Sequence, residues 1–145
     1  AAGHDPLPGA SVSAVPQVGA PGCSALVDLP GWQDLDARWA NDEVHAYNRL
    51  LSSIVLSDKE REDVAKSHTE RLAYAIRKSA FIMPLKGCHE WDREGAPLHN
   101  PSGLQAFAEA LKVSMPDKTT LYEIDSHIND AAFTDKVLAV FDEWF

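Results

Sequence analysis

The sequence predicts an α/β domain, a three-layer Rossmann-like sandwich with a mainly parallel sheet. First, an apolar run, Phe81-Ile82-Met83-Pro84-Leu85, follows a charged segment of helical periodicity, which is typical of a buried parallel strand. Second, strand-like and helix-like segments alternate from there to the end of the chain, and strands joined by helical crossovers are parallel. We therefore expect residues 1–145 to form one such domain.

The first part of the chain carries the weaker signals. Val15-Pro16-Gln17-Val18 is a short strand candidate, and its proline places it at a strand start or a sheet edge. Trp32 and Trp39 are expected to pack the following stretch onto the domain. Residues 43–51 are expected to be helical, and residues 52–56 to form a short strand.

The best-defined helix begins after Ser57. The segment Ser57-Asp58-Lys59-Glu60 has the capping-box pattern, in which the hydroxyl and the carboxylate bind the first free amides of a helix. The following apolar positions recur at intervals of four and predict one buried stripe over about five turns. These positions are Val64, His68, Leu72 and Ile76.

The rest of the chain continues the alternation. Asn100-Pro101 supplies an N-cap and a first-turn proline for a helix. Residues 119–124 are rich in β-branched and aromatic side chains and predict a strand, and residues 125–130 then cap the last helix. The expected buried faces are Leu104, Phe107, Ala108 and Leu111 in the first of these helices, and Phe133, Val137, Val140, Phe141 and Trp144 in the second.

Composition restricts the partners. The formal net charge is −9 and no cluster of Lys and Arg occurs, which argues against a nucleic acid or an anionic membrane as partner. Two cysteines are too few for a disulfide framework, and no apolar run approaches the length of a membrane span. We therefore expect a cytoplasmic protein.

Three loops are expected to meet at one edge of the sheet. Parallel strands place their outgoing loops at the same edge, and ligands of open α/β sheets bind there. The loops are residues 20–28, 86–92 and 125–130. They carry Cys23, Ser24, Asp28, Lys86, Cys88, His89, Glu90, Asp92, Asp125, His127 and Asn129.

Lys86 and Gly87 suggest an anion site. The glycine allows the backbone to approach a ligand closely, and the ammonium supplies a point charge suited to phosphate. The pair is also common at any turn that follows a strand, so a purely structural role stays open.

Asp125 and His127 suggest acid–base chemistry. Residues two apart on an extended stretch point the same way, and a carboxylate beside an imidazole can fix its tautomer. The alternative is that Asp125 belongs to a turn and that His127 is a polar side chain satisfied within the fold.

No metal site is predicted. His89, Glu90, Asp92 and His127 are ligand types, but no H-E-x-x-H, paired C-x-x-C or calcium-loop pattern occurs. Cys88 is a candidate nucleophile beside a histidine, although burial is the commoner role of such a cysteine. The sequence has neither a Walker A pattern nor G-x-G-x-x-G, so no standard nucleotide loop is present.

The same segments resemble the second domain of the Tm-one-like ATP-binding family, which includes a tomato inhibitor of tobamovirus replication. The likeness runs from about residue 4 to the end and includes Pro21-Gly22, with His45 and Asn48. It is carried by residues 81–88, Asp92, residues 97–101 and residues 123–133, and its specific motifs are Leu85-Lys86-Gly87 and His127-Ile128-Asn129-Asp130.

This resemblance implies a Rossmann-like fold, ATP or another phosphorylated ligand as cofactor, self-association into a homo-oligomer, and a preceding α/β domain in a longer two-domain protein. Positions that match the family motifs are Gly22, Asn48, Lys86, Gly87, Asp92, Asp125, His127, Asn129 and Asp130.

Two functions are therefore expected. In the first, a small anionic ligand binds at the three-loop edge, held by Gly22, Asn48, Lys86, Gly87, Asp92 and Asn129, with Asp125 and His127 as candidate catalytic groups. In the second, the domain is a non-catalytic module for dimerisation or protein interaction.

Overall fold

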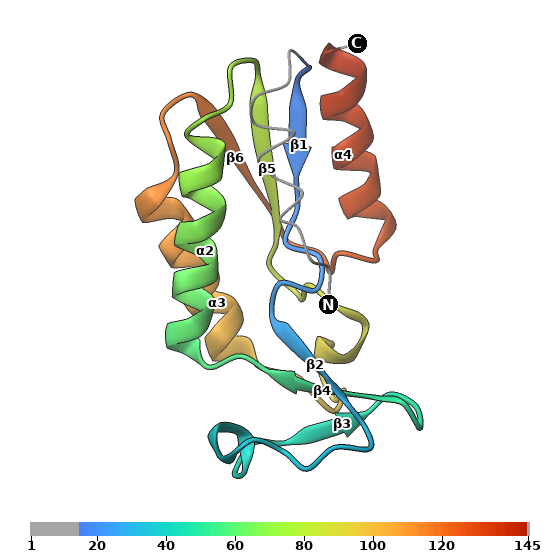
Figure 1. The fold of residues 1–145 in the computed structure, drawn as a ribbon. Helices are drawn as coiled ribbons and strands as arrows, with labels where there is room; N and C mark the ends of the chain where they lie inside the picture. Colours follow the sequence, from blue (N-terminus) through green and yellow to red (C-terminus); the bar gives the residue numbers. More distant parts are fainter. Residues whose placement is uncertain (1–14, 145) are drawn as a thin grey trace.

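A computed structural model describes residues 15–144, and within them the chain folds as a mixed α/β domain (Figure 1). Residues 1–14 and Phe145 of the predicted domain lie outside the described part. Three strands form a parallel sheet in the order β1-β5-β6, with β1 at Gln17–Gly19, β5 at Ser79–Pro84 and β6 at Thr119–Ile124. The parallel strands predicted around the apolar run are confirmed.

Strand β5 is the centre of the molecule, and all six of its residues are buried. Its side chains alternate between two cores, as the period of a strand requires. Phe81 and Met83 pack against α2 (Asp58–Leu72) and α3 (Pro101–Ser114), whereas Ala80 and Ile82 pack against α4 (Ala131–Trp144). Helices α2 and α3 therefore cover one face of the sheet and α4 covers the other (Figure 1).

The capping box at the start of α2 is confirmed. The amide of Ser57 donates to the Glu60 carboxylate at 2.9 Å, and the amide of Glu60 donates to the Ser57 hydroxyl at 3.4 Å. The predicted stripe is wrong at its far end, because α2 stops at Leu72 and Ile76 is exposed. The fully buried face is Arg61, Ala65, Thr69 and Leu72.

Helices α3 and α4 follow the predicted patterns closely. In α3, Asn100 caps the amide of Gly103 at 2.9 Å, Pro101 occupies the first turn, and Phe107, Ala108 and Leu111 are buried. In α4, Phe133 and Val140 are buried, whereas Phe141 is half exposed.

The segment between β1 and α2 departs from the prediction. It forms a second, antiparallel sheet in the order β2-β4-β3, built from β2 (Leu26–Pro30), β3 (Val44–Ala46) and β4 (Leu51–Val55). The strand predicted at residues 52–56 is present as β4, but the helix predicted at residues 43–51 is wrong. The Asn48 side chain accepts the amides of Leu50 and Leu51 at 2.7 and 3.0 Å, and this turn reverses the chain into a hairpin.

This antiparallel sheet extends beyond the carboxyl ends of the parallel strands, as an arm of the molecule (Figure 1). Within the arm, Trp39 of the short helix η1 (Ala37–Trp39) is buried against Ile54 and Leu56, as expected. Trp32 was expected to pack as well, but its side chain is 67% exposed. The predicted parallel sheet therefore consists of β1, β5 and β6 only, and a complete Rossmann sandwich stays a prediction.

No helix within residues 15–144 combines the length and the apolar character that crossing a membrane requires. The cytoplasmic location stays a prediction.

Candidate functional site

The three predicted loops do converge at the carboxyl ends of the parallel strands. Main-chain bonds join the loops after β5 and β6, from Lys86 N to Ser126 O at 3.1 Å and from Ile128 N to Gly87 O at 3.0 Å. The loop after β1 joins them through Cys23 N and Cys88 O, which are 3.1 Å apart. Sheet topology therefore predicted this meeting point correctly.

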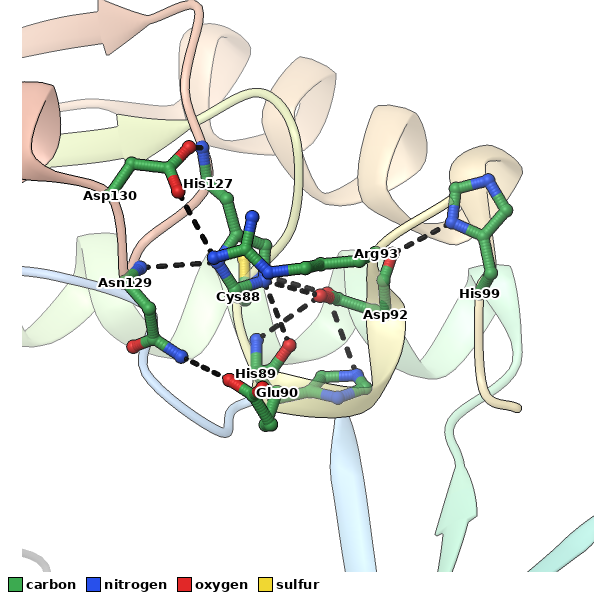
Figure 2. A network of polar contacts seen from close by, with 9 residues as sticks. All are labelled: Cys88, His89, Glu90, Asp92, Arg93, His99, His127, Asn129 and Asp130. Carbon is green, nitrogen blue, oxygen red and sulfur yellow. Dashed lines mark hydrogen bonds and ion pairs between the residues drawn. The ribbon is translucent and has the colours of Figure 1, made fainter. Parts of the chain in front are cut away.

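A buried carboxylate lies at the centre of this meeting point (Figure 2). Asp92 is on the short helix η2 (Glu90–Asp92) and is 5% exposed. Its Oδ2 accepts the Cys88 amide at 2.6 Å, and its Oδ1 accepts the His127 Nε2–H at 3.0 Å. Asp92 thus bonds to both loops at once.

His127 uses both of its ring nitrogens inside the fold. The Asn129 amide donates to Nδ1 at 3.1 Å, so the proton of the neutral ring lies on Nε2. That Nε2–H is shared between Asp92 Oδ1 and the carbonyl of His89, which lies 2.9 Å away. His127 therefore corresponds to the alternative of a satisfied polar side chain.

The predicted pairing of Asp125 with His127 is wrong. Asp125 is exposed and forms an ion pair with Lys86, whose Nζ lies 2.9 Å from its Oδ2. His127 is almost fully buried and turns toward Asp92 instead. The chain curls after β6, since the amide of Ser126 bonds to the carbonyl of Ile124, and this turn sends the two side chains apart.

Gly87 is required by the packing around Asp92. Its φ is +128°, a backbone conformation that favours glycine. A Cβ at this position would lie 2.2 Å from Asp92 Oδ1 and 2.5 Å from His127 Cδ2. The absence of a side chain at Gly87 thus makes room for Asp92 and His127, and the predicted approach of this glycine to a ligand stays a prediction.

His89 is buried with its ring nitrogens unsatisfied. Neither ring nitrogen has a hydrogen-bond partner among residues 15–144, and Asp92 Oδ2 lies 3.5 Å from Nε2. Burial lowers the pKa of His89 from its ordinary value of 6.5, with Arg61 and His127 adding to the effect and Asp92 opposing it. The folded protein therefore favours a neutral His89.

Neither thiol is activated. Burial raises the pKa of the Cys88 thiol to about 12, and burial with the charge of Asp28 raises the pKa of the Cys23 thiol. A nucleophilic cysteine needs the opposite shift. Among the described residues, no three His, Cys, Asp or Glu side chains are arranged to hold a metal ion.

A cavity of about 430 Å³ opens beside this buried cluster. Two cations line it, and each is already paired: Lys86 with Asp125, and Arg93 with Asp130 at 3.0 Å. The pKa of Asp130 is lowered by the amide of His127, which donates to its carboxylate, and by Arg93. The lining residues are Leu85, Lys86, Asp92, Arg93, Glu94, His99, Asn100, Pro101, Leu104, His127 and Asp130.

A second cavity of about 290 Å³ adjoins the first. Both are lined by His99 and Asn100, the two residues that precede α3. The remaining walls of the second cavity come from the loop before β3, from β4 and the start of α2, and from Pro97 and Leu98.

The other predicted ligand-binding residues lie elsewhere. Gly22 is exposed near Ile128, and Asn48 caps the hairpin turn between β3 and β4. The Asn129 side chain donates to Glu90 at 2.9 Å. Of the predicted set, the larger cavity is lined by Lys86, Asp92 and His127.

Sequence reasoning missed Arg93 and His99 as lining residues. His99 lies inside the Pro97-Leu98-His99-Asn100-Pro101 motif, in which Asn100 and Pro101 indicate only a helix cap. One signal in the sequence could have identified His99 as a lining residue. It stands directly before an N-cap, in a loop that returns to the carboxyl end of a strand.

Replacing Gly87 by Ala is expected to destabilise the fold more than the matched change at Gly95. Both glycines have positive φ, but a Cβ at Gly95 meets nothing within 4 Å. Gly95→Ala therefore measures backbone strain alone, about 1–2 kcal/mol. Gly87→Ala adds the clash with Asp92 and His127, for which we expect a further 1–3 kcal/mol, about the cost of overpacking. Urea unfolding of both variants checks this, and equal losses would contradict the packing argument.

His89 is expected to make the fold less stable in acid. Its folded pKa is below 6.5, so below that pH the unfolded chain takes up a proton that the folded chain resists. The free energy of unfolding should therefore fall as the pH drops from 7 toward 5. His89→Phe should flatten this dependence and keep the stability at pH 7, because the unsatisfied ring nitrogens are removed. Urea unfolding at several pH values measures it, and an unchanged slope in His89→Phe would contradict the assignment.

Comparison with known proteins shows where this chain belongs. It is 39% identical over 142 residues to a "UPF0261 protein" of Brucella melitensis biotype 1, a match that covers 98% of this chain and 34% of that protein. A "UPF0261 protein" of Clostridium tetani is 27% identical over 133 residues, covering 91% of this chain and 33% of its own length. The chain thus spans about a third of the length of these relatives. The family described as "Uncharacterised protein family (UPF0261) C-terminal domain" matches residues 1–145, and the chain belongs to this family.

Proposed function

We propose that this domain binds a small anionic ligand, of the phosphorylated kind that includes ATP, at the carboxyl ends of β5 and β6. The observation that carries the proposal is the cavity of about 430 Å³, where Lys86 and Arg93 lie beside the first turn of α3. Its size is within the range of about 300–1,000 Å³ of small-molecule sites. Its place, outside the carboxyl ends of parallel strands, is where open α/β sheets bind ligands.

Little free energy is needed to free the two cations of this cavity from their ion pairs. Lys86 and Asp125 are largely exposed, and solvent-exposed ion pairs contribute only about 0–1 kcal/mol. Arg93 and Asp130 are also partly open to solvent. A phosphate group carries more charge than a carboxylate and offers several acceptor oxygens, so it can replace either carboxylate. Arg93 can bind two phosphate oxygens through its planar guanidinium.

Asp92 and His127 support the cavity wall and do not supply chemistry in this proposal. Their polar atoms bond to each other and to the two loops. The proposal is accordingly one of binding, and no reaction is assigned.

The names of the matching family and relatives do not mention ATP or any other ligand. Nucleotide binding therefore rests on the sequence resemblance and on this cavity.

Anion binding is expected to raise the thermal stability of the chain and to depend on Arg93. A ligand at 100 times its dissociation constant stabilises a fold by about 2.7 kcal/mol, which a melting curve detects. Thermal-shift measurements with inorganic phosphate, ADP and ATP should show this shift in the parent chain, and Arg93→Ala and Lys86→Ala should reduce it. Arg77→Ala is the matched control, because Arg77 is exposed and precedes β5 at the opposite end of the strand. No shift with any of these anions, or an equal loss in Arg77→Ala, would contradict the proposal.

A second candidate, self-association, is favoured by the tip of the antiparallel arm. Large apolar side chains are exposed there: Trp32 by 67%, Leu50 by 63% and Tyr47 by 57%. Main-chain bonds bring their segments to the same end of the arm, from Gly31 N to Leu50 O and from Tyr47 N to Leu51 O, and the Tyr47 ring lies against Trp91. Several large exposed apolar side chains at one end of a sheet are typical of interaction surfaces.

If the arm mediates dimerisation, Trp32→Ser and Leu50→Ser should weaken it. Sedimentation velocity over a range of protein concentrations should show a dimer in the parent chain and a shift toward monomer in both variants. Val113→Ser is the control, since Val113 is 89% exposed but lies on α3. A parent chain that stays monomeric at high concentration would exclude this candidate.

A further inference from the structure

We propose that His99 is the imidazole that contacts the ligand, accepting at its Nε2 a hydrogen bond from a hydroxyl group of a phosphorylated organic molecule. This inference rests on the anion site proposed above and adds the chemistry of the ligand's other end. The sequence pointed to His127 for a role in the site, but both ring nitrogens of that residue are used within the fold.

The hydrogen bond of His99 sets its tautomer. Nδ1 lies 2.7 Å from the main-chain carbonyl oxygen of Asp92. A carbonyl oxygen only accepts, so Nδ1 carries the proton and donates it. In the neutral ring, Nε2 then presents a lone pair, and it has no hydrogen-bond partner among residues 15–144. Figure 2 shows one ring nitrogen turned to that carbonyl and the other turned away from it.

The position of His99 places this lone pair where a ligand can reach it. The residue is exposed and lines both cavities, so a molecule that extends from one to the other passes its ring. The ring is also held in place, because its anchor is the carbonyl of Asp92, whose carboxylate bonds to the two loops. An imidazole with one nitrogen on a main-chain carbonyl and the other facing outward is an arrangement that proteins use to present a histidine to a ligand.

The second cavity indicates what the rest of the ligand is like. Its lining residues include Ile54, Leu56 and Leu98, whose side chains are apolar and buried. Its charged side chains are the carboxylates of Asp42, Glu43 and Glu60, and no lysine or arginine is among its lining residues, so a second anionic group would meet no cation there. The inferred ligand therefore has one anionic end, which meets Lys86 and Arg93, and an uncharged body that bears hydroxyl groups.

Calorimetric titration with two probes tests this. Inorganic phosphate reports on the anion site alone, and ribose 5-phosphate adds a body with hydroxyl groups. We expect ribose 5-phosphate to bind about tenfold more tightly than phosphate, the size of effect that one or two hydrogen bonds give. His99→Asn should lose most of this advantage and leave phosphate binding unchanged. Asparagine can keep the donor to the Asp92 carbonyl but has no group in the place of Nε2, and His45→Asn on β3 is the control.

Nitrogen NMR of the histidine rings gives a readout that a purely structural role would not move. The parent chain should show His99 with its proton on Nδ1, and the Nε2 signal should shift with ribose 5-phosphate but not with phosphate. A proton on Nε2, or a signal that ribose 5-phosphate leaves unchanged, would overturn the assignment. So would equal affinities for the two probes, or a His99→Asn variant that loses phosphate binding as well. If neither probe binds the parent chain, the anion site itself fails and this inference fails with it.

Discussion

The buried carboxylate of Asp92 is the constraint on which the geometry of this domain's sheet edge depends. Removing a carboxylate from water costs several kcal/mol unless other groups replace its hydration. Here the amide of Cys88 and the imidazole of His127 replace it, and both come from loops that leave neighbouring strands. The two loops must keep this arrangement for the charge to remain satisfied. A single buried charge thereby determines the positions of the residues around it.

The residues of this edge fall into a buried group and an exposed group. Asp92, His127 and Gly87 are in contact with one another, and their polar atoms are used within the fold. Lys86 and Arg93 lie farther out, in ion pairs that water can reach. Binding requires groups that can exchange partners, and precise placement requires groups that cannot. The exposed group can exchange partners and the buried group cannot. His99 is anchored to the buried group through the carbonyl of Asp92, and it lines the same cavity as the exposed cations.

The strands and helices that were predicted correctly are those whose signals are local. The Asn100-Pro101 start of α3, the bounds of β6 and the capping box of α2 each depend on neighbouring residues, and the structure confirms them. The run from Phe81 also predicted a buried strand, because few other elements bury consecutive apolar residues on both faces. The convergence of three loops followed from topology alone.

The wrong or missed predictions depend on contacts that the sequence pattern does not reveal. Residues 43–51 have apolar spacing compatible with a helix, but the turn at Asn48 and the pairing of Val44 with Ile54 select a hairpin. The Asp125–His127 pair assumed an extended chain after β6, which in fact curls. His99 was not recognised because its anchor, the carbonyl of Asp92, is seven residues away and carries no sequence signal. Side-chain roles at this edge therefore required the folded geometry.

The close approach at Gly87 also bears on how this sequence can diverge. A side chain at position 87 would overlap both Asp92 and His127, so the absence of a Cβ there makes room for their contact. A lineage that lost the carboxylate would leave His127 Nε2 with the His89 carbonyl alone, and one that gained a side chain at position 87 would separate the pair. Substitutions at positions 87, 92 and 127 are thus not independent, and we expect a change at one of them to be tolerated only when the other two change as well. The edge of this sheet is accordingly expected to evolve as a unit, while the exposed cations around it can change one at a time.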